Sequence, residues 1–214
     1  MQRLVTLLYF RIQKIYNMKS TLFVLATIFL VACGGTGGGG GVTANLDGFD
    51  SESAGNGVSI ATKKDGAGNL MEKGYLSGGA KSGMWMTYYT DKDAGRIRTI
   101  ASYSNGILNG PYLELSNRGQ IETEVNYLNN KYHGTVTNYK FGRPTAVKNY
   151  KNGELDGVSI DYFSDGDVQK EINFKGGKQH GTMKWFNEDG QVTMEYEYKN
   201  GEKVSGGIVK SEGE

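Results

Sequence analysis

The chain has 214 residues, with 24 Lys and Arg against 23 Asp and Glu, so its formal net charge at pH 7 is +1. This balance argues against an electrostatic nucleic-acid binder, which needs a concentrated basic face. The 33 glycines, 2 prolines and 14 tyrosines are typical of aromatic strands joined by tight turns. They argue against a helical protein, because glycine inside a helix costs about 1 kcal/mol relative to alanine.

Residues 1–32 predict an export signal. Lys19 follows Met18 and places a positive charge before an apolar run over residues 21–31. The run is too short to span a bilayer as a helix, which takes about 20 residues, but it fits the hydrophobic region of a signal peptide. We interpret Met18 as the initiator and residues 1–17 as an upstream extension. An unusually long charged region before the run is the alternative.

The apolar run ends in a segment that resembles the lipobox of bacterial lipoproteins, and Cys33, the only cysteine of the chain, lies within it. The segment reads Leu30, Val31, Ala32, Cys33 and Gly34. The resemblance implies acylation of the Cys33 thiol, cleavage before it and, because residue 34 is not Asp, sorting to the outer membrane. Two or three acyl chains, at about 0.8 kcal/mol per buried CH2, anchor a protein without a spanning segment. A secretory signal with an incidental cysteine, or an uncleaved anchor, is the alternative.

Residues 33–48 are predicted to be a tether between the acylated cysteine and the folded part. Glycines at 34, 35 and 37–41 make this stretch a flexible coil. A glycine loop that cradles a phosphate is the alternative. It is less favoured, because no predicted strand or helix lies beside it to orient its amides.

Residues 49–207 carry a repeated phrase: an aromatic residue, a glycine three positions later, a second glycine, a run that ends in an aromatic residue, and Asp-Gly. The leading aromatic residues are 28, 24, 23, 24 and 24 residues apart, and such a period indicates a repeat array. These leading residues are Tyr75, Tyr103, Tyr127, Tyr150, Phe174 and Tyr198. The second glycines are Gly83, Gly110, Gly134, Gly157 and Gly181.

One repeat predicts two antiparallel strands. Apolar and polar residues alternate over 158–162 and again over 168–174, a period of two that is typical of strands. Asp165-Gly166 between them predicts a type I′ hairpin turn, and Asn152-Gly153 and Asn200-Gly201 predict the turns at the opposite end. The residues five positions after each second glycine should stack as one ladder across the sheet. They are Tyr88, Leu115, Tyr139, Tyr162 and Phe186.

The sequence therefore predicts an all-β fold: an elongated antiparallel β-hairpin repeat array that forms a single meandering sheet of about six repeats. Stacked hairpins share an apolar face that one hairpin could not bury. A degenerate cap repeat is expected before Tyr75, because residues 57–60 copy residues 157–160 and Asp65-Gly66 supplies a turn. Residues 208–214 are predicted to be a polar tail.

The repeated phrase resembles the MORN repeat, most closely the bacterial variant found in proteins described as YwqK-like antitoxins. The phrase is met over residues 150–166 and 174–190, and the resemblance covers about residues 49–207. The third repeat departs from it, because Asn130 replaces the first glycine and residues 141–144 replace the Asp-Gly turn. The resemblance implies a single-sheet repeat fold and leaves the turn geometry of the third repeat open.

The titratable residues do not predict an active site. His133 and His180 occupy the same repeat slot two periods apart. Four strands at ~4.8 Å each would separate them by roughly 19 Å, too far to share a metal ion. The pairs Glu122/Glu124 and Glu195/Glu197 are interpreted as solvated sheet surface. Asp165 and Asp189 are interpreted as turn residues with left-handed backbone.

Trp85 and Trp185 are predicted to pack within the array. The chain has no P-loop, zinc-ligand spacing or dinucleotide fingerprint, so we predict no enzyme, no metal site and no cofactor. Five basic residues fall in the middle repeats and are interpreted as ordinary solvated charge, with a contact for an anionic partner as the alternative. They are Lys131, Lys140, Arg143, Lys148 and Lys151.

These expectations combine into a lipid-anchored protein of the bacterial cell envelope that is held at the outer membrane by acyl chains on Cys33. Its sheet would bind a protein or an envelope polymer and no nucleic acid. The alternative, which the family resemblance implies, is an antitoxin or immunity protein that neutralises a toxin in the envelope.

Overall fold

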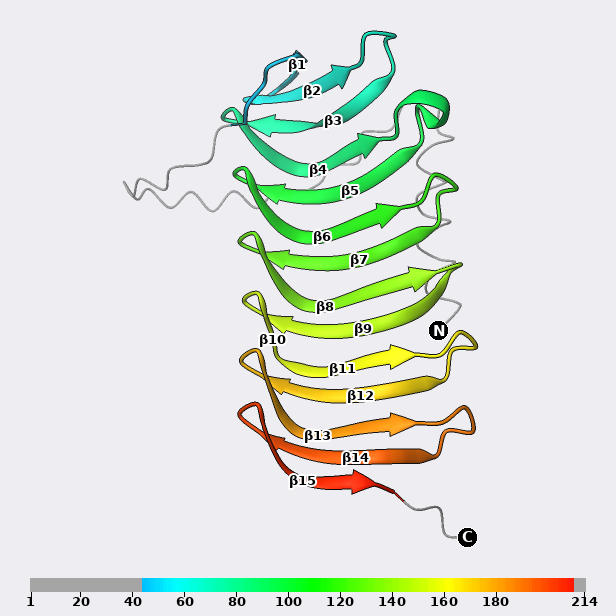
Figure 1. Cartoon of the computed structure of the whole chain (residues 1–214). Helices are drawn as coiled ribbons and strands as arrows, with labels where there is room; N and C mark the ends of the chain where they lie inside the picture. The colour runs from blue at the N-terminus through cyan, green and yellow to red at the C-terminus, as the bar shows by residue number, and fades with distance from the viewer. Residues whose placement is uncertain (1–43, 210–214) are drawn as a thin grey trace, which may run out of the picture. The chain divides into compact units, whose positions relative to one another are not determined.

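A single open antiparallel β-sheet makes up the part of the chain that the computed structural model describes, residues 44–209 (Figure 1). Its 15 strands follow one another across the sheet in chain order, except that the two-residue β10 pairs only with β9. The predicted all-β hairpin array is confirmed. The elements are β1 Phe49–Gly55, β2 Val58–Lys64, β3 Leu70–Ser77, β4 Ala80–Tyr88, the 3-10 helix η1 Asp91–Asp93, β5 Ile97–Ser104, β6 Ile107–Leu115, β7 Ile121–Leu128, β8 Lys131–Lys140, β9 Arg143–Lys151, β10 Glu154–Leu155, β11 Gly157–Tyr162, β12 Val168–Lys175, β13 Lys178–Phe186, β14 Val192–Lys199 and β15 Glu202–Ile208.

The predicted signal peptide, the lipobox with Cys33 and the glycines of the tether lie outside the described residues, as does the end of the predicted polar tail. Among residues 44–209, no helix has the length and apolar character needed to cross a membrane.

At one side of the sheet, where the strands end, seven closely similar turns lie one after another. We call this side, which is formed by turns and not by a terminal strand, the uniform edge. These turns join β1 to β2, β3 to β4, β5 to β6, β7 to β8, β9 to β10, β12 to β13 and β14 to β15. Both central residues have positive φ in each turn, for example 54° at Asn152 and 92° at Gly153. Two successive left-handed residues make a type I′ turn, and Asn and Gly adopt that backbone most readily. The predicted turns at Asn152-Gly153 and Asn200-Gly201 are confirmed.

The opposite edge, which we call the variable edge, differs from the prediction at Asp165-Gly166. The Phe163 amide donates to the Asp167 carbonyl at 2.8 Å, and the Gly166 amide donates to the Phe163 carbonyl at 3.1 Å. Gly166 has a φ of 109°, whereas Asp165 is not left-handed, so the turn is not type I′. It is a three-residue loop in which glycine supplies the one left-handed residue.

The same bond pattern closes three further turns on the variable edge, at residues 65–69, 116–120 and 187–191. The prediction of left-handed backbone is therefore wrong for Asp189 as it is for Asp165. The left-handed residue of the turn at 187–191 is Gly190. In the first unit Gly68, with a φ of 86°, takes the place expected for Gly66.

The third repeat keeps its turn at the uniform edge and changes it at the variable edge. Asn129 and Asn130 have φ values of 52° and 62°, so Asn130 replaces glycine without altering the type I′ turn. At the variable edge Phe141 and Gly142, with φ values of 52° and 78°, make a two-residue turn between β8 and β9. Left-handed backbone costs roughly 1–2 kcal/mol for an L-residue, so Phe141 is strained.

The second glycine of each repeat lies within a strand and not in a turn. It has positive φ and pairs across the sheet with the leading aromatic residue of the next repeat. The pairs are Gly83 with Tyr103, Gly110 with Tyr127, Gly134 with Tyr150, Gly157 with Phe174 and Gly181 with Tyr198. A left-handed glycine at a bulge bends its strand, and the opposing ring covers backbone that lacks a side chain. Figure 1 shows the strands bending near the uniform edge, on the left of the view.

The core is one row of side chains across a single face, which we call the inner face. Cross-strand partners lie on the same face, and in this row they are Ala61, Gly74, Trp85, Ala101, Tyr112, Val125, Val136 and Lys148, followed by Ser159, Ile172, Met183 and Tyr196. Trp85 is 2% exposed, Val125 3% and Met183 6%. Within the described residues the sheet has no second layer above it, so the bend of the strands and the larger neighbouring side chains produce this burial.

The first strands cover Trp85 most completely. A Cβ on Gly74 would lie 2.2 Å from the Trp85 ring, so the indole lies directly against the backbone of β3. Phe49 and Tyr103 meet the ring edge-on at centroid distances of 6.1 and 6.3 Å. The indole N–H donates to the Tyr75 carbonyl at 2.8 Å. Small residues beneath a large ring thus allow side chains from separate strands to meet over it.

Residues 44–48, assigned above to the tether, contact this first unit. The Ala44 amide donates to the Gly79 carbonyl at 3.0 Å. Ala44 and Leu46 pack against the cluster of Ala61, Leu76 and Trp85. The described chain is therefore packed against the sheet before β1 begins.

The ladder predicted from the residues five positions after each second glycine lies on the opposite face, which we call the outer face. Side chains alternate between the two faces along a strand, and these five residues alternate with those of the inner row. All five are half-buried. Tyr88 pairs with Ile97 and Phe186 with Val192, so residues of the return strands separate the ladder residues. Successive ladder residues are two strands apart, about 9.6 Å, and the ladder therefore alternates with apolar residues of the return strands.

Candidate binding surfaces

The inner face has a hollow beside the buried row, over strands β3 to β6. Its volume is about 260 Å³. Two tyrosines, two threonines, two carboxylates and an arginine line it next to Trp85 and Ala101: Tyr103, Tyr112, Thr87, Thr99, Glu72, Glu114 and Arg98. The hydroxyls of Thr87 and Thr99 hydrogen bond to each other at 2.7 Å. Rings with a few polar groups around them are typical of binding sites.

Lys81 decides which rings of the hollow can meet a ligand. Its ammonium group lies 4.1 Å from the Trp85 ring centroid and 5.4 Å from that of Tyr103, and it forms an ion pair with Glu72. Because Trp85 is also covered by Phe49, this tryptophan is part of the scaffold, as the sequence predicted. Tyr103 and Tyr112 remain half-exposed.

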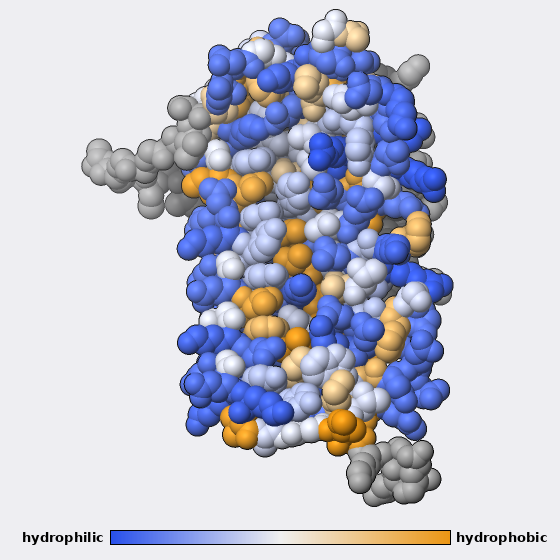
Figure 2. Space-filling model, viewed as in Figure 1, coloured by the Kyte–Doolittle hydropathy of each residue, from blue (hydrophilic) through white to orange (hydrophobic). Residues whose placement is uncertain are grey.

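Four tyrosines continue from the hollow along the inner face, and we call them the tyrosine ladder: Tyr112, Tyr127, Tyr132 and Tyr150. Their successive ring centroids are 5.8, 5.1 and 5.2 Å apart, with interplanar angles of 74°, 57° and 69°. Such tilted arrangements match the quadrupole of aromatic rings. Each ring comes from the next of strands β6 to β9, so the ladder crosses the strands. Figure 2 shows apolar side chains along the middle of the face in view, with hydrophilic side chains at both margins.

Burial raises the pKa of Tyr103, and the Glu72 carboxylate raises it further. Burial is also the main cause of the raised pKa of Tyr112, Tyr127 and Tyr150. A neutral phenol hydroxyl can both donate and accept a hydrogen bond to a ligand.

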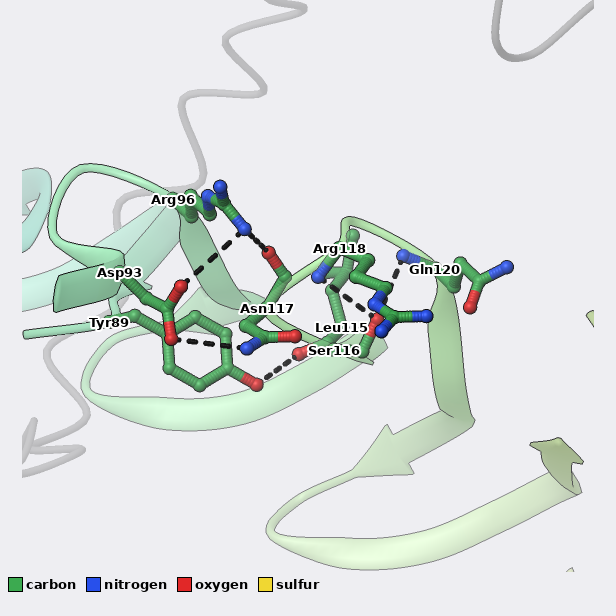
Figure 3. A network of polar contacts seen from close by, with 8 residues as sticks. All are labelled: Tyr89, Asp93, Arg96, Leu115, Ser116, Asn117, Arg118 and Gln120. Carbon is green, nitrogen blue, oxygen red and sulfur yellow. Dashed lines mark hydrogen bonds and ion pairs between the residues drawn. The ribbon is translucent and has the colours of Figure 1, made fainter. Parts of the chain in front are cut away.

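A network of polar contacts joins two turns of the variable edge (Figure 3). The Tyr89 hydroxyl donates to the Leu115 carbonyl at 2.7 Å, and the Asn117 amide group donates to Asp93 at 3.1 Å. Arg96 forms an ion pair with Asp93 at 3.5 Å and donates to the Asn117 carbonyl. Gly83 and Tyr103 are 20 residues apart, three more than Gly157 and Phe174, and these three extra residues make a longer loop that is braced against the next turn.

Phe141 stands out on the same edge. Its side chain is 80% exposed, and Lys140 lies 5.9 Å from its ring centroid. A hollow of about 400 Å³ lies beside it, lined also by Arg118 and Tyr139. Among the two-residue turns within residues 44–209, only this one has a residue other than Asn or Gly at its first left-handed position.

The predicted cluster of five basic residues is not one patch. Lys131 and Lys151 lie beside the uniform edge, Lys140 and Arg143 lie at the variable edge, and Lys148 lies in the inner row. A strand of nine residues is about 30 Å long. Basic residues that belong to the same strand, such as Arg143 and Lys151, therefore lie at its opposite ends. The five residues therefore do not form one contact for an anionic partner.

The two histidines share one structural role. Nδ1 of His133 accepts a hydrogen bond from the Asn152 amide at 3.5 Å, and Nδ1 of His180 accepts one from the Asn200 amide at 3.4 Å. Each asparagine begins the next type I′ turn. Within residues 44–209, no group of three or more His, Cys, Asp or Glu side chains is placed to hold a metal ion.

The carboxylates singled out from the sequence take part in single surface contacts. Glu124 accepts a hydrogen bond from the Tyr139 hydroxyl at 3.2 Å, Glu195 lies 3.6 Å from Lys184, and Glu197 accepts from Thr182 at 3.2 Å. Trp185 packs edge-on against Tyr196 at 6.0 Å. These contacts are those of a sheet surface.

The residue before the leading ring has a structural role that the sequence did not predict. Asn149 donates from its side chain to the Val158 carbonyl at 2.7 Å, and Asn173 does the same to the Thr182 carbonyl at 2.7 Å. Each acceptor directly follows a second glycine, so the asparagine satisfies a carbonyl freed by the bulge. The signal was present, because Asn precedes the leading aromatic residue at 126, 149 and 173.

Comparison with known proteins identifies the repeat. Residues 155–175 and 179–200 match the MORN repeat variant family. No curated protein sequence matches the chain. Among solved structures, the chain is similar to the crystal structure of TarM and to that of a point mutant of S. aureus TarM in complex with Fondaparinux, alpha-GlcNAc-glycerol and UDP.

Each of these two structures aligns at 8% identity and a TM-score of 0.26, over 74% of this chain and 21% of the TarM chain. The chain spans only about a fifth of their length, and similarity at this level says nothing about its fold or function. The family match covers two units, and the same strand and turn pattern extends through the rest of the array, which is consistent with a MORN-type repeat array.

Proposed function

We propose that this chain is a lipid-anchored protein of the bacterial cell envelope that binds a protein or an envelope polymer on the inner face of its MORN-type array. The observation that carries the proposal is the tyrosine ladder, which continues from the hollow of Glu72 and Glu114 across four strands. A partner of extended shape would meet one exposed and three half-buried hydroxyl-bearing rings in succession, and many weak contacts then act together.

The proposal includes no catalytic role. Of the polar groups that line the hollow, Thr87 binds Thr99, and Glu72 pairs with Lys81 beside it.

Anchoring is proposed from the lipobox and places the protein at the outer membrane. Membrane fractionation of the wild type and of Cys33→Ser tests it. We expect the wild type in the membrane fraction and the variant in the soluble fraction, with changed electrophoretic mobility. A variant that stays membrane-bound with unchanged mobility would refute acylation.

Binding is tested by affinity capture from an envelope extract with the full chain, Tyr132→Ser and Tyr162→Ser as baits. Tyr132 is 37% exposed on the tyrosine ladder, whereas Tyr162 is a half-buried ring of the outer face. We expect a partner that the wild type and Tyr162→Ser retain and that Tyr132→Ser loses. Equal loss in both variants would contradict binding on the inner face.

The identity of the retained partner also decides between a scaffold and the immunity role that the family resemblance implies. A toxin that acts in the envelope would support the second.

A further inference from the structure

The last four turns of the variable edge form a basic half and an acidic half, whereas the first two turns, at residues 65–69 and 89–96, carry charges of both signs. The turns at 116–120 and 141–142 and the strand ends beside them carry the exposed cations Arg118, Lys140 and Arg143, with one exposed carboxylate, Glu122. The next two turns carry exposed carboxylates: Asp165, Asp167, Glu188 and Asp189. Successive turns on this edge are two strands apart, about 9.6 Å. The two halves therefore lie one after the other along the same edge.

Phe141 lies in the last turn of the basic half, next to the first acidic turn. It is 80% exposed and left-handed, with a φ of 52°. Strained backbone lowers stability, and strain that persists at one site points to a function there. The corresponding turns of the uniform edge use Asn or Gly, so the fold itself does not require phenylalanine at such a position.

We propose that two copies of this chain associate through their variable edges, antiparallel to each other, about a two-fold axis between the Phe141-Gly142 turn and the loop at residues 163–167. A two-fold axis brings the basic half of each copy against the acidic half of the other, because both copies use the same surface. The exposed ring is buried near the axis. The hollow of about 400 Å³ beside Phe141 gives the second copy a concave surface to enter.

The charges favour a second copy over an anionic membrane surface. A uniformly negative surface would attract Arg118, Lys140 and Arg143 and repel the four carboxylates on the adjoining turns. A second copy complements both halves at once, and such complementarity determines which partner is selected and in which orientation. Arg143 also donates to the carbonyls of Ser164 and Asp165 at 3.3 and 3.4 Å, so the two halves are held together within one copy.

The test uses two full-length copies with different affinity tags, produced together, solubilised in detergent and captured by one tag, with the second tag quantified. We expect co-capture of the wild type. Phe141→Asn should weaken association roughly tenfold and raise the midpoint of thermal unfolding by about 2–4 °C, because it removes the strain. A variant that is more stable yet associates less cannot be explained by misfolding.

Charge reversal gives the decisive comparison. One variant combines Arg118→Glu with Lys140→Glu, and the other combines Asp167→Lys with Glu188→Lys. We expect neither variant to capture itself and the mixture of the two to be captured like the wild type. Absence of wild-type co-capture, self-capture of either variant at the wild-type level, or failure of the mixture would each overturn the proposal.

Two further arms separate the alternatives. Binding of a monomeric wild type to vesicles of anionic lipid that is lost in Phe141→Asn would assign the ring to a membrane and overturn the proposal. Tyr132→Ser should leave co-capture unchanged, since the inner face takes no part in it. Loss of co-capture in Tyr132→Ser would overturn the assignment to the variable edge, whatever becomes of the function proposed for the inner face.

Discussion

The first and last strands of the array are built from the same repeat, yet they bury their side chains to different degrees. Strands β2 to β5 contain five buried apolar residues: Ala61, Leu76, Ala80, Trp85 and Ala101. Among the apolar residues of β11 to β15 only Met183 is buried. Val204 and Ile208 on the last strand are 62% and 80% exposed. The two tryptophans show the reason. Trp85 lies in the inner row against Gly74, whereas Trp185 lies two residues further along its strand, opposite Lys170 and Met194.

The repeated phrase thus determines the strands and turns, whereas the residues between its fixed positions determine how stable each part of the array is. Trp85 is covered because Gly74 and Ala61 leave room for it and because Phe49 and Leu46 reach it from the beginning of the described chain. Met183 has no comparable cover. We expect the first five strands to unfold last.

The largest expected effect is that of Trp85→Ala. Truncating a buried tryptophan costs about 3–5 kcal/mol of unfolding free energy, through lost burial and the cavity left behind. Trp185→Ala removes a half-buried ring and should cost less than half as much. Chemical denaturation of both variants measures the difference, and equal losses would show that the two ends are equally well packed.

Gly74→Ala should have the next largest effect. The added methyl group would lie 2.2 Å from the Trp85 ring and force it outward, and such overpacking typically costs about 1–3 kcal/mol. Gly66→Ala is the matched control, because nothing lies within 4 Å of the added methyl group and Gly66 is not left-handed. The midpoint of thermal unfolding should fall in the first variant only. If both variants melt together with the wild type, Trp85 is not held against the backbone of β3.

The sequence predicted the parts of the fold that local chemistry decides. Asn152-Gly153 can be recognised as a type I′ turn because few other residues adopt two successive left-handed conformations. Gly157 could not be placed in the same way. A bulge glycine and a turn glycine both need positive φ, and only the cross-strand register shows that Gly157 faces Phe174.

The candidate surfaces were less predictable, because they depend on residues that meet only after the strands have paired. Tyr112 and Tyr132 are 20 positions apart in the sequence, and the ring of Tyr127 joins them. The exposure of Phe141 follows from a two-residue turn where the turns at 116–120 and 163–167 have a three-residue loop. The two ends of the array likewise look alike in the sequence, since Trp85 and Trp185 differ by only two positions within the repeat.

A third prediction concerns the middle of the array, between the two ends, at alkaline pH. The folded pKa of Tyr127 is raised above that of the unfolded chain, chiefly by burial and also by Tyr132. Its contribution to stability is therefore complete below about pH 10. It is lost progressively as the pH rises from there toward the raised value, because the unfolded state loses its proton first.

Alkaline titration followed by circular dichroism and tyrosinate absorbance measures this loss. Tyr127→Phe has no proton to lose, so its stability should fall less steeply above pH 10 than that of the wild type. Tyr162→Phe on the outer face is the control and should follow the wild type. A Tyr127→Phe variant with an unchanged alkaline slope would show that this ring does not couple ionisation to unfolding.

The smallest expected effect compares one repeat slot in the middle of the array with its equivalent at the end. His133→Ala and His180→Ala each remove one acceptor for a turn amide, and a single hydrogen bond contributes about 0.5–1.5 kcal/mol. Both bonds are long, at 3.5 and 3.4 Å, so we expect the lower part of that range. The last unit has one neighbour fewer to support its turn. Hydrogen exchange at the turn amides should therefore quicken more at Asn200 in His180→Ala than at Asn152 in His133→Ala. The reverse order would mean that the end of the array is not its weaker part.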